Sequence, residues 1–110
     1  MINSVILVGR MATDAELKYT SSGDAVCNFR IAVDRNRKGA DGEKETDFFD
    51  VTAWKQSAEF AANYLGKGRL IAVDGRLQIR QWVDKEGGKR TTPEIIANDL
   101  RGLDKPKNDE

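Results

Sequence analysis

Hydrophobic and polar residues alternate along most of this chain, which is the period of a β-strand with one buried and one exposed face. Five segments either show this alternation or are apolar runs of strand length: Val5–Met11, Val26–Asp34, Thr46–Lys55, Leu70–Val83 and Thr91–Leu103. Gly9 lies inside the first segment and predicts a bulge or a sharp bend, while Gly75 breaks the alternation of the fourth. The pattern therefore predicts a protein built from five strands.

The period changes once, in Ser57–Gly68, where apolar residues are spaced as on one face of an α-helix. These residues recur at i, i+3, i+4 and i+7: Ala58, Ala61, Ala62 and Leu65. Ser57 can cap the N-terminus of this helix, and Gly66 or Gly68 can end it in a left-handed conformation. We expect a short helix packed on the core.

Five strands with a helix between the third and the fourth suit a small closed or nearly closed barrel, and the five-stranded OB-fold is a barrel of this kind. The expected fold class is all-β with one short helix, although an arbitrary α+β meander would give the same pattern. Residues 1–103 are expected to form one domain. Residues 104–110 are polar and have no reason to fold, so we expect a disordered tail.

Composition argues against catalysis. Lys and Arg together number 18, as do Asp and Glu, so a charged partner can be inferred only from where the charges lie. The chain has no histidine, which removes the commonest general base and metal ligand. Glycine-rich phosphate loops and paired acids on neighbouring rigid elements are also missing from the sequence. We expect no enzymatic activity and no cofactor.

The sequence also favours a soluble, cytoplasmic protein. No apolar run approaches the roughly 18 residues of a membrane span, and the N-terminus MINSVILVGR lacks the features of a signal peptide. The single cysteine, Cys27, cannot form an internal disulfide, which fits a reducing compartment. No membrane partner is expected.

The segment Asp34–Glu45, DRNRKGADGEKE, has the glycine and the final glutamate of a calcium-binding EF-hand loop. Its fifth position, however, is Lys38, which puts an ammonium group where an oxygen ligand is required. Arg35 and Arg37 add two more cations, and both flanks are predicted strands instead of helices. We interpret the segment as a basic hairpin loop and expect no metal.

Parity along each strand assigns residues to faces. In Leu70–Val83 the odd positions are aliphatic and are expected in the core: Ile71, Val73, Leu77 and Ile79. The even positions, which include Arg76, Arg80 and Trp82, then point outward. Trp82 shares this face with two arginines, which favours a binding surface; the alternative is that Trp82 covers a loop or an interface.

The strand Thr46–Lys55 repeats this arrangement. Three residues are expected on its core face: Phe49, Val51 and Ala53. Phe48 and Trp54 lie on the opposite, polar face. Exposed rings interleaved with cations are typical of surfaces that bind single-stranded nucleic acid, because bases stack on the rings while cations track the phosphates. Reading of duplex DNA is not expected, since the one predicted helix is short and alanine-rich.

Basic side chains are expected around these rings. They come from the loops, the strand ends and the segment after the helix: Arg35, Arg37, Lys38, Lys55, Lys67, Arg76, Arg80 and Lys89. For any one of them, ordinary solvated surface charge is the alternative explanation. The prediction of a binding surface depends on the combination of basic residues in several loops with two strand faces that carry aromatic residues.

Three motifs carry a resemblance to a known family: Asn3 before VILVG, YLGKG after the helix, and VDGRLQIRQW. With them, residues 1–103 resemble the OB domain of bacterial single-stranded DNA-binding proteins. The resemblance implies binding of single-stranded DNA with little sequence specificity, during replication, recombination and repair, in the nucleoid. It also implies a homotetramer, or a dimer, with the first strand contributing to the dimer interface.

The resemblance assigns roles to particular positions. It implies base stacking by Phe48, Trp54 and Trp82, and DNA contact by Lys67. Arg37 stands where the family has a further aromatic residue; a guanidinium can also stack on a base and pair with phosphate.

The C-terminus departs from the family, whose members usually carry a long flexible tail with an acidic, apolar tip that recruits partners. This chain ends in KPKNDE, as a trimmed core or a short paralogue would, so recruitment of partners by a tail is not carried over. A protein–protein module of the same barrel fold, of the primosome type and with weak DNA binding, is the alternative function. Cold-shock-like RNA binding is less favoured, because the first strand lacks aromatic residues.

Overall fold

A computed structural model describes residues 1–38, 40 and 42–104 of the chain, with only the backbone described at 36–38. It has six strands and one helix: β1 Val5–Met11, β2 Glu16–Tyr19, β3 Ala25–Lys38, β4 Lys44–Trp54, α1 Lys55–Tyr64, β5 Leu70–Val83 and β6 Lys89–Gly102. The five predicted strands are all present, and the short β2 is an addition that the sequence pattern did not predict.

The strands form one sheet in the order β1-β5-β6-β4-β3-β2, and a further pairing of β1 with β3 closes five of them into a barrel. β4 and β6 are parallel, while the other pairs are antiparallel. β2 remains outside the closed ring and pairs only with β3. A closed five-stranded barrel with one short helix is the predicted OB-fold, so the predicted fold is confirmed.

Two glycines let strands approach each other closely in the barrel wall. A Cβ atom added at Gly9 would lie 2.2 Å from the carbonyl oxygen of Ala32, and one at Gly75 would lie 2.1 Å from that of Ile96, so neither position has room for a side chain. The pairing of β1 with β5 passes through Gly9 without a shift, so the predicted bulge there is wrong. A register shift is found at Asp74/Gly75 instead, where β5 pairs with β6.

The interior of the barrel is mainly aliphatic, with Phe29 as its one aromatic side chain among the described buried residues, and α1 packs against it through Ala58 and Ala61. The largest side chains that are fully buried come from five strands: Met11, Ile31, Ile71, Ile95, Val51, Val73 and Cys27. Cys27 is a free thiol whose pKa is raised by burial and by the nearby charge of Glu16. The inner face of each predicted strand supplies this core, as the alternation implies.

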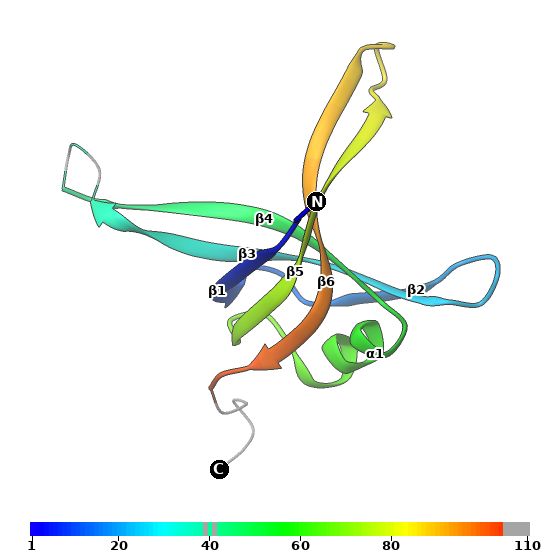
Figure 1. The fold of residues 1–110 in the computed structure, drawn as a ribbon, viewed down its shortest axis with the longest axis horizontal. Coiled ribbons are helices and arrows are strands. Elements are labelled where there is room, and N and C mark those ends of the chain that lie inside the picture. The colour runs from blue at the N-terminus through cyan, green and yellow to red at the C-terminus, as the bar shows by residue number, and fades with distance from the viewer. Residues whose placement is uncertain (39, 41, 105–110) are drawn as a thin grey trace.

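Two long hairpins extend from the barrel as arms, one formed by β3 and β4 and the other by β5 and β6 (Figure 1). Leu77 and Ile79 were expected in the core but are 42% and 54% exposed. They lie on the same face of β5 as the buried Ile71 and Val73, but further along the strand, where it leaves the barrel. The predicted core positions of these two residues are therefore wrong.

The helix begins and ends differently from the prediction. It starts at Lys55, directly after β4, and no side chain caps its N-terminus, so Ser57 lies inside the first turn. Its last residue is Tyr64, and the C-cap Leu65 has an extended conformation instead of a left-handed one. Gly68 does have a positive φ of 90°, but in the turn that follows. Among the described residues there is no helix long and apolar enough to cross a membrane.

Candidate nucleic-acid interface

Polar side chains form rows across the outer surface of β3, β4 and β6. In one row Arg30 is opposite Asp50, and Asp50 is opposite Glu94 on the parallel strand β6. In the next row Asn28 is opposite Thr52. Outward-pointing side chains that are neighbours across strands contact one another, so these rows form a continuous polar surface.

These rows line a groove with a volume of about 410 Å³. Arg80 of β5 and Thr92 of β6 complete one wall, and residues between β1 and β3, including Asp14 and Glu16, complete the other. The groove is therefore lined by residues of five strands, β2 to β6, on the outside of the barrel. Of the predicted site residues, it includes only Arg80.

Direct contacts hold the floor of the groove in place. Arg30 Nε lies 3.2 Å from Asp50 Oδ1. Thr52 Oγ1 lies 3.0 Å from both Asn28 Oδ1 and Glu94 Oε2. Thr52 is buried, while Asn28 is exposed and Glu94 is half-buried. The hydroxyl has one hydrogen and can donate it to only one of these two oxygens at a time, so it lies between two side chains that reach the groove surface.

An aromatic ring stands toward each end of this polar region on β4. Phe48 is 53% exposed and Trp54 is 41% exposed. At about 3.3 Å per residue the two rings are about 20 Å apart along the strand, so they cannot stack on the same base. The surface thus exposes two separate rings with polar groups between them.

Arg30 is a member of this site that the sequence analysis did not select. Its guanidinium carbon lies 5.4 Å from the centroid of the Phe48 ring, a distance that permits a cation–π interaction. The alternation in β3 does put Arg30 on the outer face, but its closeness to Phe48 depends on the pairing of Arg30 with Asp50. Only the strand register could have revealed it.

Trp82 lies on the second arm, where it is 43% exposed. Its indole N–H donates a hydrogen bond of 2.9 Å to Thr92 Oγ1, which fixes the orientation of the ring. Because β4 and β6 are parallel, Thr92 is displaced from Glu94 toward the Phe48 end of β4. Trp82 therefore lies on the Phe48 side of the groove, away from Trp54.

Arg35 has an environment different from the one expected of a phosphate ligand. Its Nε and Nη2 atoms donate to the two carboxylate oxygens of Asp47, each at 3.0 Å, and its Nη1 donates to Glu45. Hydrogen bonding to Arg35 lowers the pKa of Asp47 below its usual value. Two acids of β4 therefore already engage this cation.

Two further candidates of the same arm, Arg37 and Lys38, have side chains outside the described residues. The backbone of β3 continues through Lys38, which pairs with Lys44 of β4. The basic loop predicted from Asp34–Glu45 thus consists largely of paired strands, with residues 39–43 between them.

The remaining basic candidates are dispersed around the barrel and all are exposed. Arg76 lies on the outer face of β5, opposite Ile96, and Lys89 lies at the start of β6, opposite Val83. Lys55 begins α1 immediately after Trp54 and has a φ of 56°, which is uncommon for a residue other than glycine.

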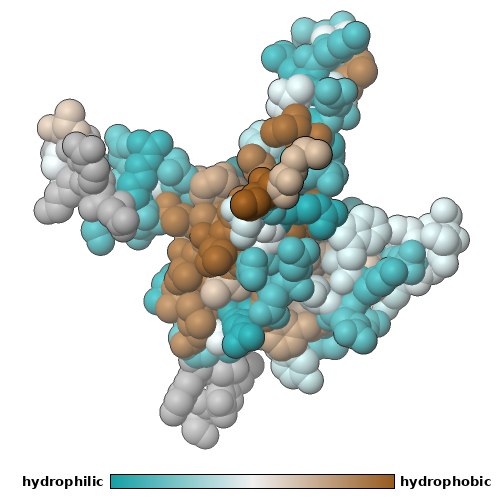
Figure 2. Space-filling model, viewed as in Figure 1, coloured by the Kyte–Doolittle hydropathy of each residue, from teal (hydrophilic) through white to brown (hydrophobic). Residues whose placement is uncertain are grey.

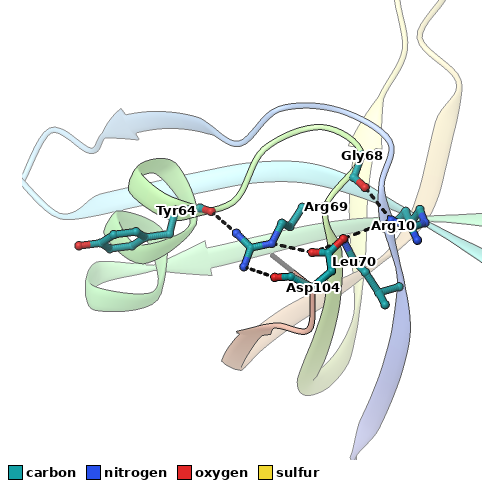
Figure 3. A network of polar contacts seen from close by, with 6 residues as sticks. All are labelled: Arg10, Tyr64, Gly68, Arg69, Leu70 and Asp104. Atoms are coloured by element: carbon teal, nitrogen blue, oxygen red, sulfur yellow. Dashed lines mark hydrogen bonds and ion pairs between the residues drawn. The ribbon is translucent and has the colours of Figure 1, made fainter. Parts of the chain in front are cut away.

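Lys67 lies in the segment between α1 and β5, which is held by several hydrogen bonds. The Lys67 backbone N–H donates to Asp14 Oδ1 at 2.8 Å. Arg69 donates from Nη1 to the carbonyl oxygen of Tyr64 at 2.8 Å and from Nε to Asp104 Oδ1 at 2.7 Å (Figure 3). The backbone that carries Lys67 is therefore fixed on both sides.

Asp104 was expected to begin a disordered tail, but it takes part in this network. Arg10 donates to Asp104 Oδ2 at 3.4 Å, and the Leu70 N–H lies 3.3 Å from both carboxylate oxygens (Figure 3). Burial raises the pKa of Asp104, but the hydrogen bonds from Leu70 and Arg69 outweigh it, so the pKa is lowered. Residues 105–110 lie outside the described part of the chain.

Comparison with known proteins identifies the family of the chain. Residues 2–103 match the model of the Single-strand binding protein family. The chain belongs to the single-strand binding protein family. Single-stranded DNA-binding proteins of Streptococcus mutans and Streptococcus pneumoniae are 44% and 46% identical to it over 104 residues. One from Caldanaerobacter subterraneus is 44% identical over the same length.

These alignments cover 94% of this chain but a smaller share of the relatives. The chain spans 63% of the Streptococcus mutans protein, 67% of the Streptococcus pneumoniae protein and 69% of the Caldanaerobacter protein. The resemblance noted in the sequence is confirmed. Membership of a family named for binding single strands also supports the expectation that the chain is not an enzyme.

Proposed function

We propose that this protein binds single-stranded DNA with little sequence preference, along the outer surface of β3, β4, β6 and β5. The observation that carries the proposal is the pair of exposed rings, Phe48 and Trp54, at the two sides of a polar groove. Every base has a face that can stack on a ring, so such a surface accepts any sequence. The related proteins of this family are named for binding single-stranded DNA.

Base stacking is assigned to three rings and phosphate contact to the cations around them. Phe48 and Trp54 have exposed rings on the part of β4 that belongs to the barrel, and Trp82 has one on the second arm. Phosphate contact is assigned to the exposed cations outside the groove, Lys55, Lys67, Arg76 and Lys89, and, from the sequence, to Arg37 and Lys38. Arg35 contributes less, because Asp47 and Glu45 already neutralise it.

An aliphatic surface on β1 supports self-association. Ile6 and Val8 are 69% and 51% exposed on the outer face of this strand, and Figure 2 shows hydrophobic residues gathered over this part of the barrel. Exposed aliphatic patches are typical of protein interfaces. We assign β1 to a dimer interface between copies of the chain, with two dimers associating into a homotetramer.

The same aliphatic surface favours a second candidate function, a protein–protein module with weak DNA binding. The two functions differ in what the aromatic face does, since a module of this second kind would not need rings beside the groove. A protein that covers exposed single-stranded DNA acts during replication, recombination and repair, so we place it at the nucleoid in the cytoplasm.

Tryptophan fluorescence tests the proposal, because stacking on a base changes the emission of an indole. Titration with poly(dT) is expected to quench the emission, and single-tryptophan variants Trp54→Phe and Trp82→Phe are expected to show that both rings contribute. Tight binding that leaves the emission unchanged would disprove the stacking assignment. A lack of binding to single strands at low salt would favour the protein–protein module.

A further inference from the structure

One carboxylate in the groove has neither a cation nor a backbone N–H as a partner among the described residues, and its surroundings indicate a use for it. The groove is lined by four acids and two arginines: Asp14, Glu16, Asp50, Glu94, Arg30 and Arg80. Asp50 pairs with Arg30, Glu16 with Lys18, and Asp14 accepts the Lys67 N–H. Within the described part of the chain, Glu94 has neither a cation nor a backbone N–H as a partner; its one contact is the Thr52 hydroxyl.

This balance of charge decides which part of a DNA strand can enter the groove. Phosphate groups would meet more carboxylates than guanidinium groups there, and like charges at short range repel each other. A nucleobase is neutral and carries N–H donors on its edge. The groove floor therefore suits base edges, while the phosphates follow the cations outside it.

Glu94 is held in a position to accept such a donor. Thr52 is buried and its hydroxyl lies 3.0 Å from Glu94 Oε2, so one carboxylate oxygen is within hydrogen-bonding distance of a buried donor. No residue in the described chain hydrogen-bonds to the other oxygen, Oε1. Glu94 is half-buried at the groove, about midway between the levels of Phe48 and Trp54 along the sheet, since it pairs with Asp50.

We propose that Glu94 accepts a hydrogen bond from the exocyclic amine of a base and so discriminates among bases within the groove. The proposal rests on the proposed path of single-stranded DNA over this face. Cytosine presents an N4 amine, which is the donor that a glutamate recognises on this base. Uracil has a carbonyl at the same position, and its N3–H is flanked by two carbonyl oxygens that a carboxylate repels. Cytosine is therefore expected to bind here in preference to uracil.

Oligonucleotides of deoxycytidine and deoxyuridine, of equal length, test this inference because they differ only around ring position 4. Wild-type protein is expected to bind the cytosine strand about threefold to tenfold more tightly, as the loss of one hydrogen bond predicts. The variant Glu94→Gln is expected to reduce this ratio toward one. The variant Glu59→Gln removes the same charge from the exposed surface of α1 and is expected to keep the wild-type ratio.

Two outcomes would overturn the inference. The first is equal affinity of the wild-type protein for the two strands, a result that requires no variant and so holds even if Glu94→Gln does not fold. The second is a folded Glu94→Gln variant that keeps the wild-type ratio, which would show that Glu94 only supports Thr52. Failure of the wild-type protein to bind either strand would contradict the proposed function itself, and is thus distinguishable from both.

Discussion

Two parts of the barrel's outer surface expose apolar side chains, and they differ in what surrounds those side chains. On β3, β4 and β6, the rings of Phe48 and Trp54 stand among polar groups such as Arg30 and Asp50, which pair with each other. On β1, Ile6 and Val8 are exposed as aliphatic side chains on alternate positions of one strand. Both surfaces are apolar in part, but only the first offers aromatic faces beside charges.

The difference indicates two kinds of partner. Aromatic faces beside cations suit the bases and phosphates of a nucleic acid. Aliphatic side chains offer neither stacking nor charge, and are stabilised only by contact with another apolar surface. We therefore assign DNA to the first surface and a second copy of the chain to β1. The first two predictions each change one surface and compare the result with a matched change elsewhere on the chain.

The largest expected effect is on the β1 surface. Val8→Glu places a charge in the proposed interface and removes about 1.5–3 kcal/mol of apolar burial from each of two copies. That loss weakens dimerisation by at least about a hundredfold. Light scattering after gel filtration is expected to show smaller oligomers than wild type. Leu103→Glu, an equal change at an exposed apolar residue on another part of the chain, is the control and is expected to leave the oligomer unchanged.

Removal of a ring is the next largest effect. Trp54→Ala or Phe48→Ala is expected to cost about 1–3 kcal/mol of affinity for single-stranded DNA, which is about 5-fold to 150-fold in Kd. Phe60→Ala removes an exposed ring from α1, where it packs beside Tyr64 at 5.4 Å, and is expected to leave Kd unchanged. Fluorescence anisotropy with a labelled oligonucleotide measures all three. An equal loss in all three variants would remove the distinction between the rings at the groove and other exposed rings.

The salt dependence of binding separates free cations from paired ones. The logarithm of the affinity is expected to fall linearly with the logarithm of salt concentration, with a slope of about −0.7 for each phosphate neutralised. Lys67→Ala is expected to reduce the slope by about 0.7. Arg35→Ala is expected to leave it almost unchanged, because Asp47 and Glu45 already engage Arg35. If both variants changed the slope equally, the ion pairs of the first arm would not matter to binding.

The smallest effect concerns the tip of the second arm. Asp84 accepts hydrogen bonds from the backbone N–H of Gly88 and from Arg90, and these lower its pKa. A lowered pKa in the folded state stabilises the protein above the pKa of the unfolded chain, about 3.9 for Asp, and this contribution is lost as the pH falls through the lower folded value. The melting temperature of Asp84→Asn is thus expected to lie below wild type near neutral pH.

The two melting temperatures are expected to converge as acid protonates Asp84 in the wild-type protein. A gap that stays constant down to low pH would show that the ionised carboxylate is not what holds the turn. DNA affinity near neutral pH is expected to change little in this variant, because Trp82 keeps its hydrogen bond to Thr92.

Much of the barrel could be predicted from the sequence because the alternation of apolar residues is a local property. Phe48, Trp54 and Trp82 were assigned to outer faces from parity alone, and all three are exposed. Parity cannot say where a strand leaves the barrel. Leu77 and Ile79 have the parity of core residues, yet they lie on the part of β5 that extends into an arm.

The groove could not be predicted, because it is formed by contacts between segments that are distant in the sequence. The pattern of one β-strand does not reveal such contacts. Arg30 meets Phe48 only because β3 and β4 pair in one particular register. The parallel pairing of β4 with β6 puts Glu94 opposite Asp50, far from it in the sequence. Arg35 has the sequence environment of a phosphate ligand, and the structure instead pairs it with acids across the hairpin.

The central claim is that rings on β4 and β5 bind the bases of a single strand, and one titration tests it most directly. Intrinsic tryptophan emission is followed while single-stranded or duplex DNA of the same sequence is added, at low and at high salt. We predict quenching by the single strand at both salt concentrations, with weaker binding at high salt, and little response to the duplex. Equal quenching by duplex and single strand, or affinity that does not depend on salt, would contradict the account.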